Sequence, residues 1–333
     1  MKKKLLKFLK YIGFLTLGIF LFWLAIKDFD RDELIGQIKN ADPTWILWSL
    51  FFMLAAHVSR AHRWTLLIGT LGHKLSLFRS FIAVMIGYIA NIAFPRMGEV
   101  SKCAVLNQTN NIKINQLFGT VLIERVVDTL CLLTVLILTF LLEYERLFYF
   151  YVVNIHDQIT PLFNWWNLLT IIGLIALFIM LYKIWEIKSK GENPLIIKIR
   201  GFLGDLKKGF ASLKEMPARS QLIFWGHSVF IWLMYWAMTY VVFFSFENLK
   251  NTEPVAGLTS LAVGSLGFVM PVQGGIGTYH WAVKEGLRLY DIPTQLGMSY
   301  ATVVHGSQAL ATILVGLLAF LALFFVKKNA KTA

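Results

Sequence analysis

The stretch NIAFPRMGE, residues 91–99, interrupts apolar sequence with a proline, a glycine and two opposite charges. The apolar segments beside it, 81–93 and 100–106, are each shorter than the roughly 20 residues of helix that cross a bilayer. Charged side chains at membrane depth cost about 2.5–3.5 kcal/mol each, and they usually face a cavity or a partner. Broken backbone at that depth is tolerated only where protein or a wet cavity covers it. The stretch therefore predicts a helix break that lines a site inside a membrane protein.

A second stretch of the same kind, MPVQGGIG, occupies residues 270–277. It again places a proline and several glycines inside an apolar run, far along the chain from the first. Opposed breaks of this kind usually form one site near the middle of the membrane. We therefore expect the two breaks to meet and the site to lie between them.

The composition supports a membrane protein. Of the 333 residues, 57% are hydrophobic and 15% charged, and the mean hydropathy is +0.62. The net charge of +13 comes from Lys and Arg gathered in a few loops, as the positive-inside rule requires, so no nucleic-acid partner is expected. Cys103 and Cys131 are too few for a disulfide framework, and no metal-ligand spacing occurs. Neither a metal nor a cofactor is expected.

Apolar runs predict an all-α polytopic protein with six full spans, at about 9–26, 44–69, 116–142, 165–182, 221–246 and 294–326. The first run follows three lysines but is too long for the apolar core of a signal peptide, so it is interpreted as an uncleaved span. The basic loop 183–220 and the lysines after the last span place both termini in the cytoplasm.

Loop charges then fix the path of the remaining segments. Each full span must join loops on opposite sides of the membrane. With the sides of the loops set by their charges, 79–113 becomes a re-entrant hairpin entered from the cytoplasm and 255–291 a re-entrant hairpin entered from outside. The alternative is a pair of short tilted spans in each case. With hairpins, residues 1–333 form one membrane domain of two inverted repeats, 9–142 and 166–326. Inverted repeats with opposed broken helices are typical of secondary transporters.

The first break supplies groups for an anion. Pro95 stops the arriving helix and Gly98 permits a tight turn. Arg96 offers a planar fork that suits phosphate or carboxylate, with Asn91 beside it. Either Arg96 holds an anionic headgroup, or it pairs with Glu99 and closes the turn.

Glu124, Arg125 and Asp128 share one face of a span, at spacings of three and four residues. One interpretation is a salt-bridge cluster that pins this span to the neighbouring hairpin. The other makes Arg125 a second phosphate contact while the two carboxylates orient the arginines. Arg60 and Arg63, at the end of the second span, are supporting candidates.

The second break offers hydrogen-bond donors to a ligand from Gln273, Gly274, Gly275 and Gly277, next to Pro271. A half-helix that starts at Gly277 would point its N-terminus at the site and favour an anion. His280, one turn further, is either a group that titrates near neutral pH or a hydrogen-bonded interior histidine. His305, inside the last span, is expected to hydrogen-bond between helices.

These pieces together resemble a known family. RAHRW at 60–64, the stretch 91–99, ERVVD at 124–128 and the stretch 271–277 stand in an order and spacing similar to those of the transmembrane, flippase-like region of lysylphosphatidylglycerol synthases. The resemblance runs from about residue 10 to residue 325. It implies a multi-pass protein of the cell (inner) membrane that moves lipids or lipid-linked headgroups between leaflets.

The chain departs from that family in two ways. The full synthases carry a cytoplasmic aminoacyl-transferase domain that residues 1–333 do not hold, so aminoacylation is not expected of this chain. The family often has a glutamate where His280 stands, which leaves a charge-coupled mechanism through that position in doubt.

The sequence thus favours a carrier, with membrane lipids as partners and an anionic headgroup or a polyprenyl-phosphate-linked substrate as cargo. No Ser-His-Asp order or nucleotide-binding loop stands out, and no catalytic residue is assigned. Two alternatives remain open. One is a membrane-embedded transferase in which Glu99 or Asp128 acts as general base. The other is a non-transporting partner of a separate lipid-modifying enzyme.

Overall fold

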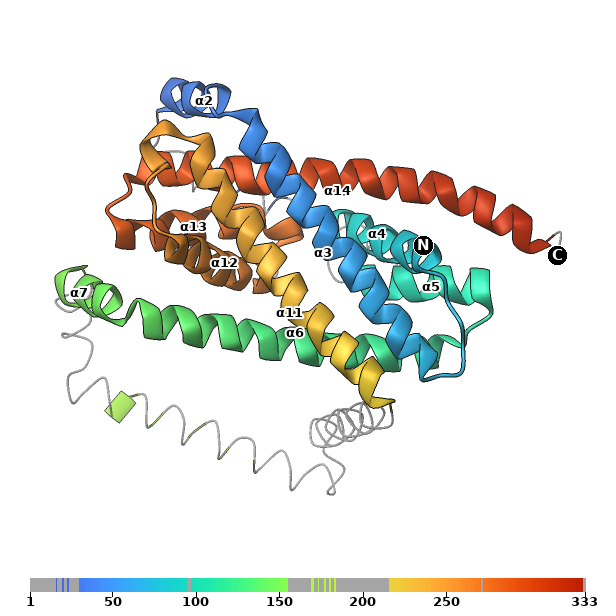
Figure 1. The fold of residues 1–333 in the computed structure, drawn as a ribbon. Helices are drawn as coiled ribbons and strands as arrows, with labels where there is room; N and C mark the ends of the chain where they lie inside the picture. Colours follow the sequence, from blue (N-terminus) through green and yellow to red (C-terminus); the bar gives the residue numbers. More distant parts are fainter. Residues whose placement is uncertain are drawn as a thin grey trace.

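The computed structural model describes residues 30–94, 97–154, 216–270 and 272–331, and isolated positions between 16 and 23 and between 169 and 183 (Figure 1). Every regular element within these ranges is helical. Several expectations lie outside the described residues: the spans at 9–26 and 165–182, nearly all of the basic loop 183–220, the N-terminus, and the tip residues Pro95, Arg96 and Pro271.

The first half of the described chain forms six helices: α2 (Arg31–Lys39), α3 (Pro43–Gly69), α4 (Leu77–Ala93), α5 (Gly98–Asn110), α6 (Ile114–Leu142) and α7 (Tyr144–Asn154). Helices α2 and α7 lie in stretches that the sequence predicted only as loops. The Asp30 carboxylate caps α2 by accepting hydrogen bonds from the Asp32 and Glu33 amides. Asp42 caps α3 in the same way, with Pro43 at the first helical position.

The second half forms α11 (Ala218–Tyr240), η2 (Val241–Ser245), η3 (Glu247–Leu249), α12 (Pro254–Val269), η4 (Gln273–Gly275), α13 (Thr278–Leu287), η5 (Arg288–Tyr290) and α14 (Thr294–Lys331). Three helical segments of the described chain are long and apolar enough to cross a membrane: α6, Ala218–Ser245 and Thr294–Phe325. Helix α3 has 27 residues and carries two arginines in its second half. A membrane protein fits these helices, whereas six spans and cytoplasmic termini stay predictions.

Two pairs of short helices stand where the sequence predicted hairpins. Helices α4 and α5 pack against each other across the first break, and α12 and α13 across the second. Their 10–17 residues give lengths of about 15–26 Å, short of the ~30 Å of a bilayer core. The breaks are therefore confirmed as helix interruptions. Their re-entry into a bilayer stays a prediction.

The two halves share one packing pattern. Helices α3 and α11 run side by side through the middle of the molecule, with the α4–α5 pair toward one end and the α12–α13 pair toward the other (Figure 1). The contact of α3 with α4 matches that of α11 with α12. The contact of α14 with α4 likewise matches that of α6 with α12. Exchanging the four helices of one half for those of the other thus preserves the main contacts. This is the pattern that two units related by a two-fold axis would give.

Glycine lets the arms of each pair approach closely. A Cβ atom on Gly98 would lie 2.5 Å from the Gly87 carbonyl oxygen and would also meet the Asn91 side chain. A Cβ atom on Gly267 would lie 2.9 Å from the Tyr279 Cα. Both distances are shorter than carbon atoms tolerate, so each pair depends on a residue without a side chain at this place.

The Gly98→Ala substitution is expected to destabilise the protein by about 1–3 kcal/mol, because the added methyl group must push apart the backbones of α4 and α5. The matched control is Gly119→Ala on α6, where a Cβ atom would meet nothing within 4 Å. Thermal unfolding in detergent is the measurement. Equal midpoints for the two variants would contradict the close approach of the helices.

Candidate functional site

Seven charged side chains gather where α3, α5 and α6 meet. We call them the charged cluster: the cations Arg60, Arg63, Lys102 and Arg125, and the carboxylates Glu99, Glu124 and Asp128. Cations outnumber carboxylates by one. Most of these groups are buried, and burying a charge is costly unless a partner offsets it. The pairing inside the cluster therefore decides which charges are still available to a ligand.

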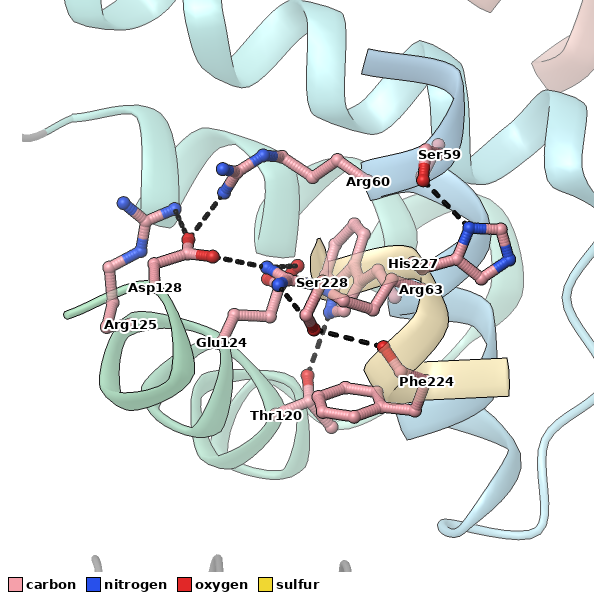
Figure 2. A network of polar contacts seen from close by, with 12 residues as sticks. Ser59, Arg60, Arg63, Thr120, Glu124, Arg125, Asp128, Phe224, His227 and Ser228 are labelled. Carbon is pink, nitrogen blue, oxygen red and sulfur yellow. Dashed lines mark hydrogen bonds and ion pairs between the residues drawn. The ribbon is translucent and has the colours of Figure 1, made fainter. Parts of the chain in front are cut away.

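Asp128 is the centre of the charged cluster. Its Oδ2 atom accepts a hydrogen bond of 2.6 Å from Arg60 Nη1, and its Oδ1 atom accepts one of 2.7 Å from Arg63 Nη2. Figure 2 shows Arg60 and Arg125 reaching this carboxylate from different sides. The distance from Arg125 Nη2 to Asp128 Oδ2 is 3.8 Å. Asp128 thus holds two arginines of α3 in place, an arrangement compatible with the interpretation in which the carboxylates of this face orient arginines.

Glu124 forms its hydrogen bond with a lysine, while its Oε1 atom lies 3.9 Å from Arg63 Nη2. The Lys102 ammonium donates a hydrogen bond to Glu124 Oε2, and both groups are buried. The Lys102 Nζ atom also lies 4.2 Å from the centre of the Trp64 ring, a cation–π contact. This pair ties α5 to α6, which is the salt-bridge interpretation of the motif. Sequence reasoning did not single out Lys102; a lone lysine in a short apolar arm was the available signal.

Arg125 and Glu99 form the accessible edge of the charged cluster. Their side chains are 47% and 27% exposed, and Arg125 Nε lies 3.8 Å from Glu99 Oε1. This distance is too long for a hydrogen bond. Among the described residues, Arg125 is thus the cation of the cluster that is held least tightly.

A small cavity lies beside this edge. Its polar lining consists of Arg60, Tyr88, Asn91, Glu99, Lys102 and Arg125, and it has room for a water-sized group. The Asn91 Oδ1 atom accepts a 2.6 Å hydrogen bond from the Gly98 amide, so this carbonyl group closes the first break. The structure therefore brings Asn91, Glu99, Arg60 and Arg125 to one place.

The second break touches the first. The Gln273 Nε2 atom donates a 2.8 Å hydrogen bond to the Ile92 carbonyl oxygen. Gly274, Gly275 and Gly277 all have positive φ, at 61°, 70° and 85°, a backbone conformation that favours glycine. The two breaks therefore meet as expected, through a side chain of one and the backbone of the other.

The groups behind the second break bind each other. Helix α13 begins after Gly277, as predicted, and the Gly277 amide donates a 3.3 Å hydrogen bond to His280 Nδ1. The His280 ring lies 4.9 Å from that of His305, whose Nε2 atom is 2.9 Å from the Gly274 carbonyl oxygen. His280 thus matches the interior interpretation. Neither it nor the three glycines line the small cavity.

Helix α11 contributes polar groups that sequence reasoning missed. The Tyr235 hydroxyl oxygen accepts a 3.1 Å hydrogen bond from Arg60 Nη2. The Ser228 hydroxyl oxygen accepts one of 3.1 Å from Arg63 Nη1. His227 lies between Ser59 and His62, at 2.7 Å from each, and Figure 2 shows its contact with Ser59. Polar residues inside the apolar run of α11 were the signal for these contacts.

Comparison with known proteins gives a family match. Residues 11–316 match the family model described as the lysylphosphatidylglycerol synthase TM region. The chain is 30% identical over 114 residues to UPF0104 membrane protein MJ1595 of Methanocaldococcus jannaschii, covering 33% of this chain and 34% of that protein. It is 25% identical over 208 residues to UPF0104 membrane protein MJ1078 of the same organism, covering 62% of this chain and 81% of that protein. The matched part is thus about a third of the length of the first relative. No solved structure matches the chain.

The Asp128→Asn substitution is expected to destabilise the protein by about 3–5 kcal/mol, because it leaves the buried Arg60 and Arg63 without their shared charge partner. The control is Glu247→Gln, which removes an exposed carboxylate paired with Lys250 and is expected to change stability by less than about 1 kcal/mol. Thermal unfolding in detergent compares the two. An Asp128→Asn protein as stable as the control would show that the arginines do not depend on this carboxylate.

Proposed function

The chain belongs to the family of the lysylphosphatidylglycerol synthase transmembrane region, and on this basis we propose that it moves an anionic lipid headgroup between the leaflets of the cell membrane. The cargo is a phospholipid or a polyprenyl-phosphate-linked headgroup. The family match covers most of the chain, and together with the apolar helices it supports a multi-pass membrane protein of a family named after a lipid-modifying enzyme. Both relatives are named as membrane proteins.

One observation carries the proposal: three cations line a cavity at the first helix break, and one of them is half exposed. Arg60 and Lys102 lie in its wall and Arg125 at its edge. Guanidinium groups bind phosphate oxygens with two parallel hydrogen bonds, and an ammonium group adds a point charge. A phosphate that enters from the edge meets Arg125 first. The tails of the lipid would stay in the bilayer beside the helices.

The contact between the two breaks would then control passage. In this structure the hydrogen bond from Gln273 to the Ile92 carbonyl joins the breaks. A headgroup that crosses from one side to the other separates these two groups, and Gln273 becomes free to donate to the headgroup instead. Without a nucleotide-binding loop in the sequence, we expect the movement to be passive or coupled to an ion.

A membrane-embedded transferase is the second candidate, because Glu99 is a partly exposed carboxylate beside three cations. A general base needs a free carboxylate within reach of its substrate. Asp128 fits that role poorly, since both of its oxygens accept hydrogen bonds from arginines. A non-transporting partner of a separate lipid-modifying enzyme remains the third candidate.

Lipid movement in liposomes tests the proposal. The purified full chain is reconstituted and offered labelled zwitterionic, anionic, aminoacylated and polyprenyl-phosphate lipids. One class is expected to move, and Arg125→Gln is expected to slow it at least tenfold, because the half-exposed guanidinium is lost. The matched control is Arg146→Gln, which removes a similarly exposed, ion-paired arginine in α7, away from the charged cluster.

The outcomes separate the candidates. If no lipid class moves although the protein is folded, the carrier is wrong. Product formation from a lipid-linked substrate would then support the transferase, and co-purification with a lipid-modifying enzyme the partner. Equal slowing by Arg125→Gln and Arg146→Gln would show that this cavity plays no specific part in lipid movement.

Arg96, at the tip of the first break, is a further proposed phosphate contact. Arg96→Ala is expected to slow the same lipid at least several-fold, because the sequence places a permanent charge at the point where the headgroup passes. The same liposome assay measures it. Unchanged movement would show that the charge at position 96 plays no part in transport.

A further inference from the structure

We propose that Glu99 is a built-in substitute for the phosphate of the cargo. Its carboxylate occupies the place beside Arg125 that the headgroup phosphate would take, and the two compete. The inference rests on the proposed function, since it concerns the same cavity. It assigns Glu99 a specific role: it sets how tightly a phosphate group binds and allows the phosphate to leave again.

The first argument is the weakness of the pair between Glu99 and Arg125. Their nearest charged atoms are 3.8 Å apart, and both side chains are partly exposed. The other carboxylates of the charged cluster are held by direct hydrogen bonds, such as those of Asp128 at 2.6 and 2.7 Å. Exposed or loosely formed ion pairs contribute at most about 1 kcal/mol. Glu99 is therefore the carboxylate of the cluster that a competing anion could displace at the lowest cost.

The second argument is the position of Glu99 in the first turn of α5. The partial positive charge of a helix N-terminus attracts carboxylates and phosphates alike. The α5 N-terminus is held in place at the break, because the Gly98 amide donates to Asn91 and the Ser101 amide to the Met97 carbonyl. The same field that stabilises Glu99 here would stabilise a phosphate in its place.

The third argument is an unused donor on a residue of the cavity wall. Arg60 is 6% exposed and lines the cavity, and its Nε atom finds no hydrogen-bond partner among the described residues. A buried donor without an acceptor costs free energy, commonly about 1–3 kcal/mol. The oxygens of Asp128 already accept from Nη1 of Arg60 and from Arg63. An incoming phosphate oxygen would supply the missing acceptor.

The size of the cavity links these observations. It admits only a water-sized group, and Glu99 forms part of its wall. A phosphate group is several times larger than water, so it fits only when part of the wall moves aside, and the loosely paired Glu99 side chain is placed to do so. The exchange of one anion for another keeps a negative charge beside Arg125 at every stage.

Direct binding measurements test the inference without requiring transport. The purified full chain in detergent at low salt is titrated with dihexanoylphosphatidylglycerol, a soluble short-chain lipid, and separately with inorganic phosphate. Glu99→Gln keeps the size of the side chain and removes its charge. It is expected to tighten phosphate binding about fivefold, the factor that corresponds to one weak ion pair.

Three further variants make the result specific. Glu99→Asp keeps the charge and is expected to bind close to the wild type, whereas Glu99→Ala is expected to bind more tightly, as Glu99→Gln does. Glu285→Gln removes a carboxylate of similar exposure on α13, which pairs with Arg288 of η5, and it is expected to leave binding unchanged. Arg125→Gln is expected to weaken binding and thereby locate the probe at the cavity.

The outcomes distinguish this inference from the proposed function. If the wild type binds and Arg125→Gln weakens binding, but both Glu99→Gln and Glu99→Ala bind no tighter than the wild type, Glu99 is not a competitor and the inference is overturned while the cavity stands. If the wild type binds neither probe, the proposed function fails together with it. Tighter binding of both probes shows that Glu99 replaces the phosphate group itself. If the Glu99 variants bind only the lipid more tightly, Glu99 replaces the whole headgroup and not the phosphate group alone.

Discussion

The carboxylate of Asp128 is the interaction on which the charged cluster depends. It accepts hydrogen bonds from two buried arginines of α3 and holds them against α6. Removing charges from water is expensive, so neither arginine could stay inside the bundle without this shared partner. The cavity at the first break has its cationic wall because Asp128 places Arg60 there. The edge of the cavity remains open because Arg125 Nη2 lies 3.8 Å from Asp128 Oδ2, which is too far for a hydrogen bond.

A second constraint acts at the breaks, where backbone must approach backbone. Gly98 lets α4 and α5 meet, and Gly267 does the same for α12 and α13. The two halves use one packing pattern but fill it with different chemistry. The first half carries the charged cluster, and the second carries the rings of His280 and His305 around a glycine turn. The two sides of the contact between the breaks are therefore unlike, with the charged cluster near one and histidine rings and a glycine turn at the other.

The sequence predicts the helical framework well because local signals determine it. The expected limits of the spans at 44–69 and 116–142 differ from those of α3 and α6 by at most two residues. Both breaks stand where proline and glycine interrupt the apolar pattern. Helices α2 and α7 were not anticipated, because α2 is largely polar and the 11 residues of α7, although mostly apolar, are too few to cross a membrane. The ends of long apolar helices can thus be predicted from the proline, glycine and polar residues that stop them, whereas short helices outside the predicted spans cannot.

The partners of the charged residues could not be predicted to the same degree. The grouping of Glu124, Arg125 and Asp128 on one face follows from helical spacing. That Glu124 binds Lys102, and that Asp128 binds Arg60 and Arg63, depends on how three helices cross. Such contacts join residues more than 20 positions apart, and no local pattern encodes them. The site was thus recognisable as a set of charges before its internal pairing was known.

The bond that joins the two halves at the breaks has a side-chain donor and a main-chain acceptor. Any amino acid at position 92 presents the same carbonyl oxygen to Gln273. Selection on this contact therefore acts on position 273 alone, and positions 92 and 273 are not required to change together. Pairwise covariation across related sequences would carry no trace of the bond, even though it connects the two breaks.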